Sequence, residues 1–167
     1  MMATFSVRPA TADDAAAVAS VLQVIVSERV HSAIDRAWSV EEERAYLESL
    51  SSREVVHVAI DRNVGVVGLQ VLDRWSPSLD SMAHVGQVGT FVLPTYRRRG
   101  LGHTLWAATV TFARSAGYRK LIIQVRGTNA SAQAFYRSIG FLECGRLVRQ
   151  VVIDGVEEDE LLMELLL

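Results

Sequence analysis

The sequence is poor in cysteine and in metal-ligand patterns, which removes several classes of site. Cys144 is the only cysteine among 167 residues, so an internal disulfide and a cysteine-rich metal site are excluded. We expect Cys144 to be buried and inert, because a reactive thiol needs a nearby base and the sequence shows none. His31, His57 and His103 lack the spacing of metal ligands, so we expect no metal.

Long apolar runs and an excess of one charge are also missing. No run approaches the roughly 20 apolar residues of a membrane helix, and residues 1–10 lack the apolar centre of a signal peptide. The net charge is -2, because the arginines at 97–99 are balanced by acidic residues at 157–160. We therefore expect a soluble, cytoplasmic protein that binds neither nucleic acid nor membrane, with one domain over residues 1–167.

The most informative stretch is VGTFVLPTYRRRGLGHTLW, residues 88–106. Strand-forming residues precede Pro94, and apolar residues then recur at helical spacing from Leu101 to Phe112. The pattern predicts a strand, a tight turn and the N-terminus of a helix, one directly after the other.

This turn has the composition of a phosphate-binding site. A helix N-terminus has unpaired N–H groups and a partial positive charge, so it attracts an anion. Gly100 and Gly102 would let the anion approach the backbone, and residues 97–99 add three arginines. Leu105 stands where the dinucleotide-binding fingerprint needs its third glycine, and the Gly-Lys-Ser/Thr of a P-loop is absent. We interpret the turn as a diphosphate cradle of another kind.

The rest of the chain alternates between strand and helix signals. Capping boxes at Thr11-Ala-Asp-Asp14 and Ser39-Val-Glu-Glu42 predict two helix starts, Asn129 predicts a third, and Gly117 and Gly140 predict helix ends. We expect strands at residues 4–8, 55–60, 64–71, 83–93, 121–125, 146–153 and 160–166, with a loop at 73–80. The order β-α-α-β-β-β-α-β-α-β-β predicts an α/β (α+β) fold, with helices on both faces of a mixed sheet.

Three features together resemble the GNAT N-acetyltransferase superfamily over nearly the whole chain. They are the loop Arg97-x-x-Gly100-x-Gly102, the order of elements, and the stretch from Asn129 to Phe141 with its Asn…Phe-Tyr…Gly-Phe pattern. Residues 154–163 are similar to the ending of many small-molecule members. The resemblance implies a mostly antiparallel sheet of about seven strands flanked by four helices, in which strands 83–93 and 121–125 splay apart.

The resemblance also implies acetyl-CoA as co-substrate and attack by a primary amine in a ternary complex. The amine would belong to a small molecule, such as an amino acid, a polyamine or an amine antibiotic. The pantetheine arm would pair with the first splayed strand as an added strand does. The implied cofactor-binding residues are Phe91, Val92, Leu93, Arg97, Arg98, Arg99, Gly100, Leu101, Gly102, His103, Asn129 and Tyr136.

Two catalytic residues follow from the resemblance and from strand alternation. Tyr136 would approach the thioester sulfur, where a phenol can share or deliver a proton.

Protein-lysine-acetylating members carry a Glu on the strand before the loop, and counting back from Arg97 reaches Gly86, which has no carboxylate. His84 would share the face of Gly86, so His84, or a water that it orders, is the candidate base, and Asp80 is the reserve. The alternative for His84 is a half-buried strand histidine without a catalytic role.

Other functions and assemblies stay open. The missing carboxylate fits a non-catalytic module that senses acyl-CoA. Residues 27–38 could be an exposed connection, or they could form the acceptor wall of a protein N-terminal or lysine acetyltransferase, with Glu28, His31 and Asp35 as candidate substrate contacts. The apolar residues 161–167 could pair across a homodimer or fill the sheet.

Overall fold

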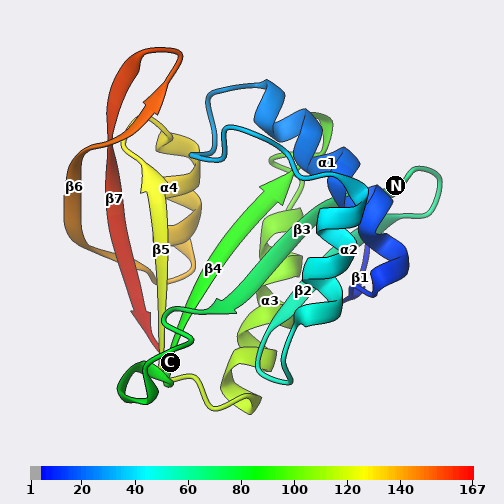
Figure 1. Cartoon of the computed structure of the whole chain (residues 1–167), viewed down its shortest axis with the longest axis horizontal. Coiled ribbons are helices and arrows are strands. Elements are labelled where there is room, and N and C mark those ends of the chain that lie inside the picture. The colour runs from blue at the N-terminus through cyan, green and yellow to red at the C-terminus, as the bar shows by residue number, and fades with distance from the viewer. Residues whose placement is uncertain (1–4) are drawn as a thin grey trace.

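The computed structural model describes residues 5–167, which form a seven-stranded sheet with helices on both faces (Figure 1). The strands are β1 Ser6–Pro9, β2 Val55–Asp61, β3 Gly65–Arg74, β4 Val85–Val92, β5 Lys120–Arg126, β6 Leu142–Ile153 and β7 Val156–Leu166. The helices are α1 Ala15–Ser27, α2 Val40–Ser49, α3 Leu101–Ser115 and α4 Ala130–Ser138, and 3-10 turns occupy Ala12–Asp14, Asp80–Met82 and Pro94–Tyr96. The predicted fold class and order of elements are confirmed. Thr4, the start of the first predicted strand, lies outside the described residues.

The strand order β1-β2-β3-β4-β5-β7-β6 contains one parallel neighbour pair, β4 and β5, and the other pairs are antiparallel. β4 and β5 pair only from Val85 opposite Lys120 to Gln87 opposite Ile122. Beyond Gln87 the two strands diverge, as Figure 1 shows, and the implied splay is therefore present. The divergence leaves one edge of β4 without a strand partner from Val88 onward.

The two helical layers bury different side chains of the same strands. α1 and α2 cover one face, where Val56, Val58 and Leu69 are buried, and α3 and α4 cover the other, where Leu72 and Leu121 are buried (Figure 1). Alternation along each strand sends neighbouring side chains to opposite faces. Full burial of such a side chain contributes about 1.5–3 kcal/mol, so both layers hold the sheet in place. Within residues 5–167, no helix is long and apolar enough to cross a membrane.

Both predicted capping boxes form, but the one at Thr11 begins the 3-10 turn Ala12–Asp14, and α1 starts after it at Ala15. The backbone N–H of Thr11 donates to Oδ2 of Asp14 at 2.8 Å. The N–H of Ser39 donates to Oε2 of Glu42 at 2.7 Å, and the N–H of Glu42 donates back to Oγ of Ser39 at 3.2 Å. The side chain of Asn129 caps α4. These bonds satisfy donors that a helix start leaves unpaired.

Two predicted strand boundaries were wrong near the site. β3 continues through Arg74, so Asp73 lies in a strand opposite Gln87 of β4 and not in a loop. Pairing with β4 overrides the low strand propensity of Asp. β4 begins at Val85, so His84 lies in the turn before it.

Cys144 is exposed, and the prediction that it is buried was wrong. It lies on β6, the last strand of the sheet, where its thiol donates to the carbonyl of Leu162 at 3.5 Å. Leu142 and Val148 of the same strand are more than two-thirds exposed, at 73% and 70%. Cysteine is usually buried, but an edge strand with an uncovered face exposes residues of any type.

Candidate active site

A cavity of about 890 Å³ opens where β4 and β5 part, between α3 and α4. Most of the predicted cofactor residues line it: Phe91, Val92, Arg97, Arg98, Gly100, Leu101, Gly102, His103, Asn129 and Tyr136. Two predicted residues do not. Leu93 packs in the core, and the guanidinium of Arg99 lies 5.5 Å from the ring centre of Tyr96. The stretches around residues 91, 100 and 136, which are far apart in the sequence, thus surround one space.

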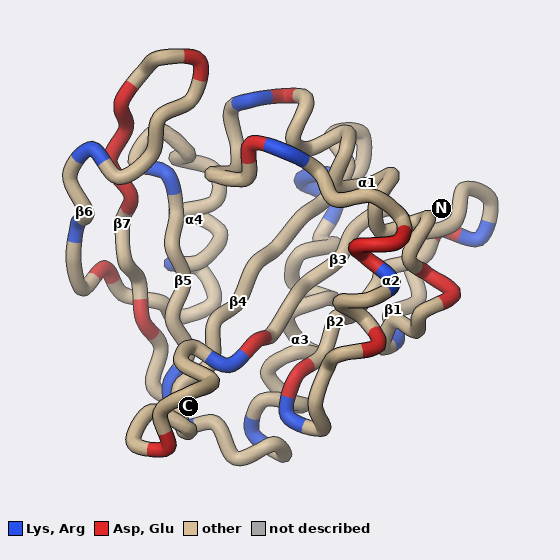
Figure 2. Tube along the Cα trace, viewed as in Figure 1, with Lys and Arg blue, Asp and Glu red and all other residues tan. Residues whose placement is uncertain are grey.

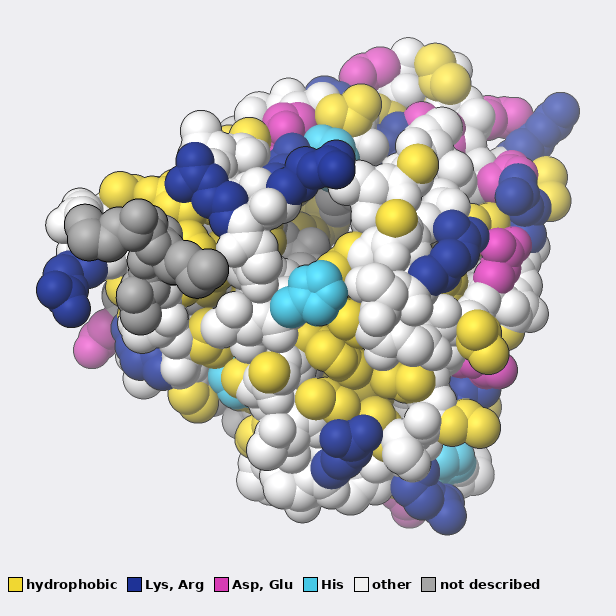
Figure 3. Space-filling view, turned by 180° about the vertical axis from the view of Figure 1, so that it is seen from behind, with side chains coloured by type: hydrophobic (Ala, Val, Ile, Leu, Met, Phe, Trp, Pro, Cys, Tyr) yellow, Lys and Arg dark blue, Asp and Glu magenta, His cyan; other side chains and the backbone are white. Residues whose placement is uncertain are grey.

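The glycine loop, residues 97–102, has the shape of an anion-binding site. Gly100 caps α3 in the left-handed conformation, with φ of 81°, and the first intrahelical bond runs from Thr104 N–H to the Gly100 carbonyl at 3.1 Å. The N–H groups before Thr104 are therefore unpaired within the helix. A Cβ at Gly102 would lie 3.0 Å from the Phe135 ring of α4, so a larger residue here would require that ring to move. On the face covered by α3 and α4, basic side chains stand next to a hollow and a histidine (Figure 3).

The side chain of Arg97 is occupied by the end of α1 and the residues after it. Its guanidinium pairs with both carboxylate oxygens of Glu28, one at 2.9 Å, and lies 3.0 Å from Nε2 of His31. Its Nε donates to the Val92 carbonyl at 3.0 Å. The Arg97 guanidinium lowers the pKa of Glu28 below its usual range. Glu28 and His31 therefore contact Arg97, which joins α1 to the glycine loop.

Tyr136 points from α4 to β4. It is 5% exposed, and its hydroxyl donates to Oγ1 of Thr90 at 2.8 Å, an oxygen that also accepts from Nε2 of Gln70 at 2.8 Å. Burial raises the pKa of Tyr136 to about 12. The phenol is thus protonated at neutral pH and lies at the wall of the larger cavity.

A second cavity, of about 350 Å³, lies between α1, α2 and strands β2 to β4. Its wall is mainly apolar, and its polar or charged lining residues are Arg36, Glu43, Tyr46, Asp73 and Gln87. Val88, Gly89 and Phe91 of β4 line both cavities. The two spaces therefore meet across β4, at the point where β5 has turned away.

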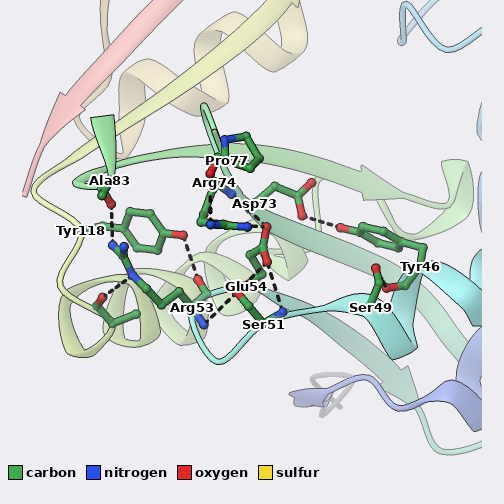
Figure 4. A network of polar contacts seen from close by, with 11 residues as sticks. Tyr46, Ser49, Ser51, Arg53, Glu54, Asp73, Arg74, Pro77, Ala83 and Tyr118 are labelled. Atoms are coloured by element: carbon green, nitrogen blue, oxygen red, sulfur yellow. Dashed lines mark hydrogen bonds and ion pairs between the residues drawn. The ribbon is translucent and has the colours of Figure 1, made fainter. Parts of the chain in front are cut away.

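Asp73 brings a carboxylate to the second cavity. β4 itself carries no charged residue (Figure 2), so a carboxylate near it has to come from its neighbours. Figure 4 shows Asp73 of β3 and Tyr46 of α2 pointing toward each other, and the Tyr46 hydroxyl donates to Oδ1 of Asp73 at 2.7 Å. Burial raises the pKa of Asp73, the Tyr46 bond opposes this shift, and the nearby Glu54 adds to it. Asp73 is thus a carboxylate with increased proton affinity in an apolar cavity.

The family model for the acetyltransferase (GNAT) family matches residues 22–141. The chain belongs to this family.

Individual GNAT relatives agree with that assignment. The chain is 32% identical to the N-alpha-acetyltransferase RimI of Mycobacterium tuberculosis over 94 residues, which is 56% of this chain and 54% of RimI. The chain spans about half the length of the curated relatives it matches. It superposes on the ribosomal-protein-alanine N-acetyltransferase from Brucella melitensis with a TM-score of 0.87 and 27% identity, over 97% of this chain and 99% of that one. YncA from Salmonella typhimurium, solved with its cofactor acetyl-CoA, has the same fold, with a TM-score of 0.88, 23% identity and coverage of 97% and 93%.

The structure does not bring His84 to the site of this GNAT protein. His84 lines neither cavity, and its carbonyl accepts from the N–H groups of Arg119 and Lys120 at the start of β5. His84 lies six positions before Thr90, which corresponds to about 20 Å along an extended chain. Asp80, the reserve candidate, is exposed on the 3-10 turn Asp80–Met82 and also lines neither cavity.

Gly86, the position at which some family members carry a Glu, faces the core. A Cβ at Gly86 would lie 2.8 Å from a Leu72 side-chain carbon and 2.9 Å from one of Leu121. Its neighbour Gln87 has the opposite orientation and lines the second cavity. Asp73 and Gln87 were missed by sequence reasoning, because their neighbourhood depends on the β3–β4 register. An acidic residue at the end of an otherwise apolar strand was the available signal.

Proposed function

We propose that this GNAT protein transfers the acetyl group of acetyl-CoA to a primary amine of a small molecule, by direct attack in a ternary complex. One observation carries the proposal: two neighbouring cavities share Val88, Gly89 and Phe91 of β4 as lining residues. A donor in the larger cavity and an acceptor in the smaller one would meet at β4 without an acetylated form of the protein.

The larger cavity fits the chemistry of acetyl-CoA. The edge of β4 that β5 leaves free can pair with the amides of the pantetheine arm. The first N–H groups of α3, with Gly100 and Gly102, would hold the diphosphate. Each charge-assisted hydrogen bond contributes about 1.5–3 kcal/mol, and the helix dipole adds about 0.3–1 kcal/mol. Arg97 would position this loop through Glu28, because its guanidinium is already paired.

Asp73 is the proposed general base, in place of His84. A lysine-like amine has a pKa near 10.4, so its neutral form costs about 4–5 kcal/mol at pH 7. Asp73, directly or through one water, would accept the proton as the nitrogen bonds to the acetyl carbon. Its raised pKa suits this role, because a more basic carboxylate accepts a proton at lower cost.

Tyr136 would assist the leaving sulfur. When the carbon–sulfur bond breaks, the electron pair stays on sulfur, whose thiol has a pKa of about 8.5. The Tyr136 phenol, with its pKa of about 12, would donate a hydrogen bond to the thiolate as charge develops, and complete proton transfer is not needed. The hydroxyl would exchange its bond to Thr90 for this one.

Thiol release from acetyl-CoA over pooled primary amines tests the proposal, with wild type beside Tyr136→Phe. We expect thiol only in the presence of an amine, and a fall of about 10²-fold or more in the variant. Failure to bind any acyl-CoA at micromolar concentration would contradict the proposal. Binding of acetyl-CoA without thiol release from any pool would favour a sensor of acyl-CoA.

Acetylation of protein N-termini is the second candidate, favoured by the similarity to RimI. The acceptor cavity argues for a small molecule, because Ile34 and Trp38 from the α1–α2 connection line a space of only about 350 Å³. A comparison of N-terminal acetylation across the proteome, with and without the protein, separates the two candidates.

A further inference from the structure

Glu43 is a buried carboxyl whose position the reaction above does not explain. It lies on the inward side of α2, lines the second cavity and is 2% exposed. Its Oε1 has no hydrogen-bond partner among residues 5–167. An unpartnered buried polar group is destabilising, and native proteins keep one where water, an ion or a ligand satisfies it.

The surroundings of Glu43 supply no compensating positive charge. The one basic side chain that lines the cavity within the described chain is Arg36, which pairs with Glu42 at 2.9 Å and is 64% exposed. The remaining wall near α1 and α2 is apolar or aromatic, and includes Leu22 and Trp38. The cavity is therefore an apolar space whose lining holds two acidic side chains, Glu43 and Asp73, and one basic side chain, Arg36, which already has a partner.

Asp73 is a second carboxyl in the same cavity, but its place in the fold is different. It lies on β3, opposite Gln87 of β4, and it has Tyr46 as a partner. Glu43 lies on α2, without such a partner. One carboxylate beside β4 is enough to receive the proton of the attacking amine, so Glu43 is left for another positive charge.

We propose that Glu43 binds a second ammonium group of the acceptor, so that the substrate is a linear diamine with an apolar spacer. One nitrogen is acetylated beside β4, and the other pairs with Glu43. The methylene groups between them pack against the apolar wall, where Trp38 meets the Tyr46 ring edge-on at 5.5 Å between centroids. This inference rests on the proposed acetyl transfer and narrows its substrate class.

Putrescine and butylamine form the decisive pair of probes, because they share a four-carbon chain and differ in one amine. We expect wild type to favour putrescine in kcat/KM by about tenfold or more. In Glu43→Gln this ratio should fall toward one, mainly through the KM for putrescine. Glu48→Gln, an exposed change on the same helix, should keep the wild-type ratio. Equal use of both amines by wild type would overturn the inference and leave acetyl transfer standing.

Thermal unfolding separates ligand binding from a structural role. Glu43→Gln should keep or raise the Tm of the free protein at pH 7, because it removes a buried carboxyl without a partner. It should also lose the Tm increase that putrescine gives wild type, whereas Glu48→Gln should retain it. A lower Tm in Glu43→Gln with an unchanged response to putrescine would show a structural role. Calorimetric titration with putrescine tests diamine binding even if no amine is acetylated. Absence of putrescine binding to wild type would contradict the inference.

Discussion

The hydroxyl of Tyr46 donates a hydrogen bond of 2.7 Å to Oδ1 of Asp73 (Figure 4), and this bond joins α2 to β3 at the wall of the second cavity. Burial raises the pKa of Asp73, and this bond opposes the shift because it stabilises the ionised carboxylate. Tyr46 therefore adjusts the proton affinity of the group that we propose as the base.

In Tyr46→Phe, we expect the acidic limb of the kcat/KM profile to move to higher pH. Removal of the donor raises the pKa of Asp73 further, and only the ionised form accepts a proton. Activity is lost as pH falls through this pKa, so the loss begins at a higher pH in the variant. Rates of thiol release across the pH range measure the shift.

The matched variant is Asp73→Asn, which should lose the acidic limb and about 10²-fold or more in kcat/KM. An Asp73→Asn protein that retains the limb would assign it to another group. An unmoved limb in Tyr46→Phe would mean that the bond does not control the base.

Tyr136→Phe should lower kcat while acetyl-CoA still binds with near wild-type affinity. The change removes the hydroxyl that donates to Thr90 but keeps the aromatic ring. The centre of that ring lies 5.5 Å from the centre of the Phe141 ring. Initial rates and calorimetric binding of acetyl-CoA give the two quantities. Tyr118→Phe is the control, because it removes a buried hydroxyl that donates to the Arg53 carbonyl away from both cavities. Equal effects of the two changes on kcat would argue against a catalytic phenol.

Gly86→Ala should destabilise the fold by about 1–3 kcal/mol through overpacking. A Cβ there would lie under 3.0 Å from both Leu72 and Leu121, in the core between β3 and β5. Denaturant unfolding measures the change. Gly145→Ala is the control, since its Cβ would meet Leu162 at an ordinary 3.6 Å. A stable Gly86→Ala protein would show that this core has room to shift.

Glu28 and Arg97 should show a coupling of about 0.5–3 kcal/mol in a double-mutant cycle of Glu28→Gln and Arg97→Gln. Arg97 lowers the pKa of Glu28, so the pair stabilises the fold above the unfolded glutamate pKa of about 4.3. That stabilisation is lost as pH falls through the lower, folded pKa. Unfolding free energies should therefore give a coupling at neutral pH that disappears in strong acid. A coupling independent of pH would point to packing and not to charge.

Local features of this fold were predictable from the sequence, because each depends on neighbouring residues. The capping boxes at Thr11 and Ser39 act over three positions, and Gly100 acts through its own backbone angle. The order of elements and the glycine loop followed from such signals. Cys144 failed the same reasoning, because its exposure depends on β6 being the last strand.

The residues of the proposed acceptor site could not be predicted, because their neighbourhood depends on strand register and on packing between distant elements. The sequence favours His84 as the candidate base and places Asp73 in a loop. Because β4 begins at Val85 and β3 extends to Arg74, Asp73 and not His84 lines a cavity beside β4. Glu43 looks like one of three consecutive acidic residues at the start of α2, and only packing of the helix on the sheet buries it alone. The partner of Arg97 lies 69 residues away, beyond any local pattern.

In the proposed mechanism, Asp73 and Tyr136 act in one reaction from the two sides of β4. The most direct measurement is mass spectrometry of an amine pool after incubation with acetyl-CoA that carries an isotopic label in its acetyl group. We predict label on a primary amine with wild type. The amount of label should fall by about 10²-fold or more with Asp73→Asn and with Tyr136→Phe. Label that reaches no amine although acetyl-CoA binds, or that reaches amines equally in all three proteins, would contradict this mechanism.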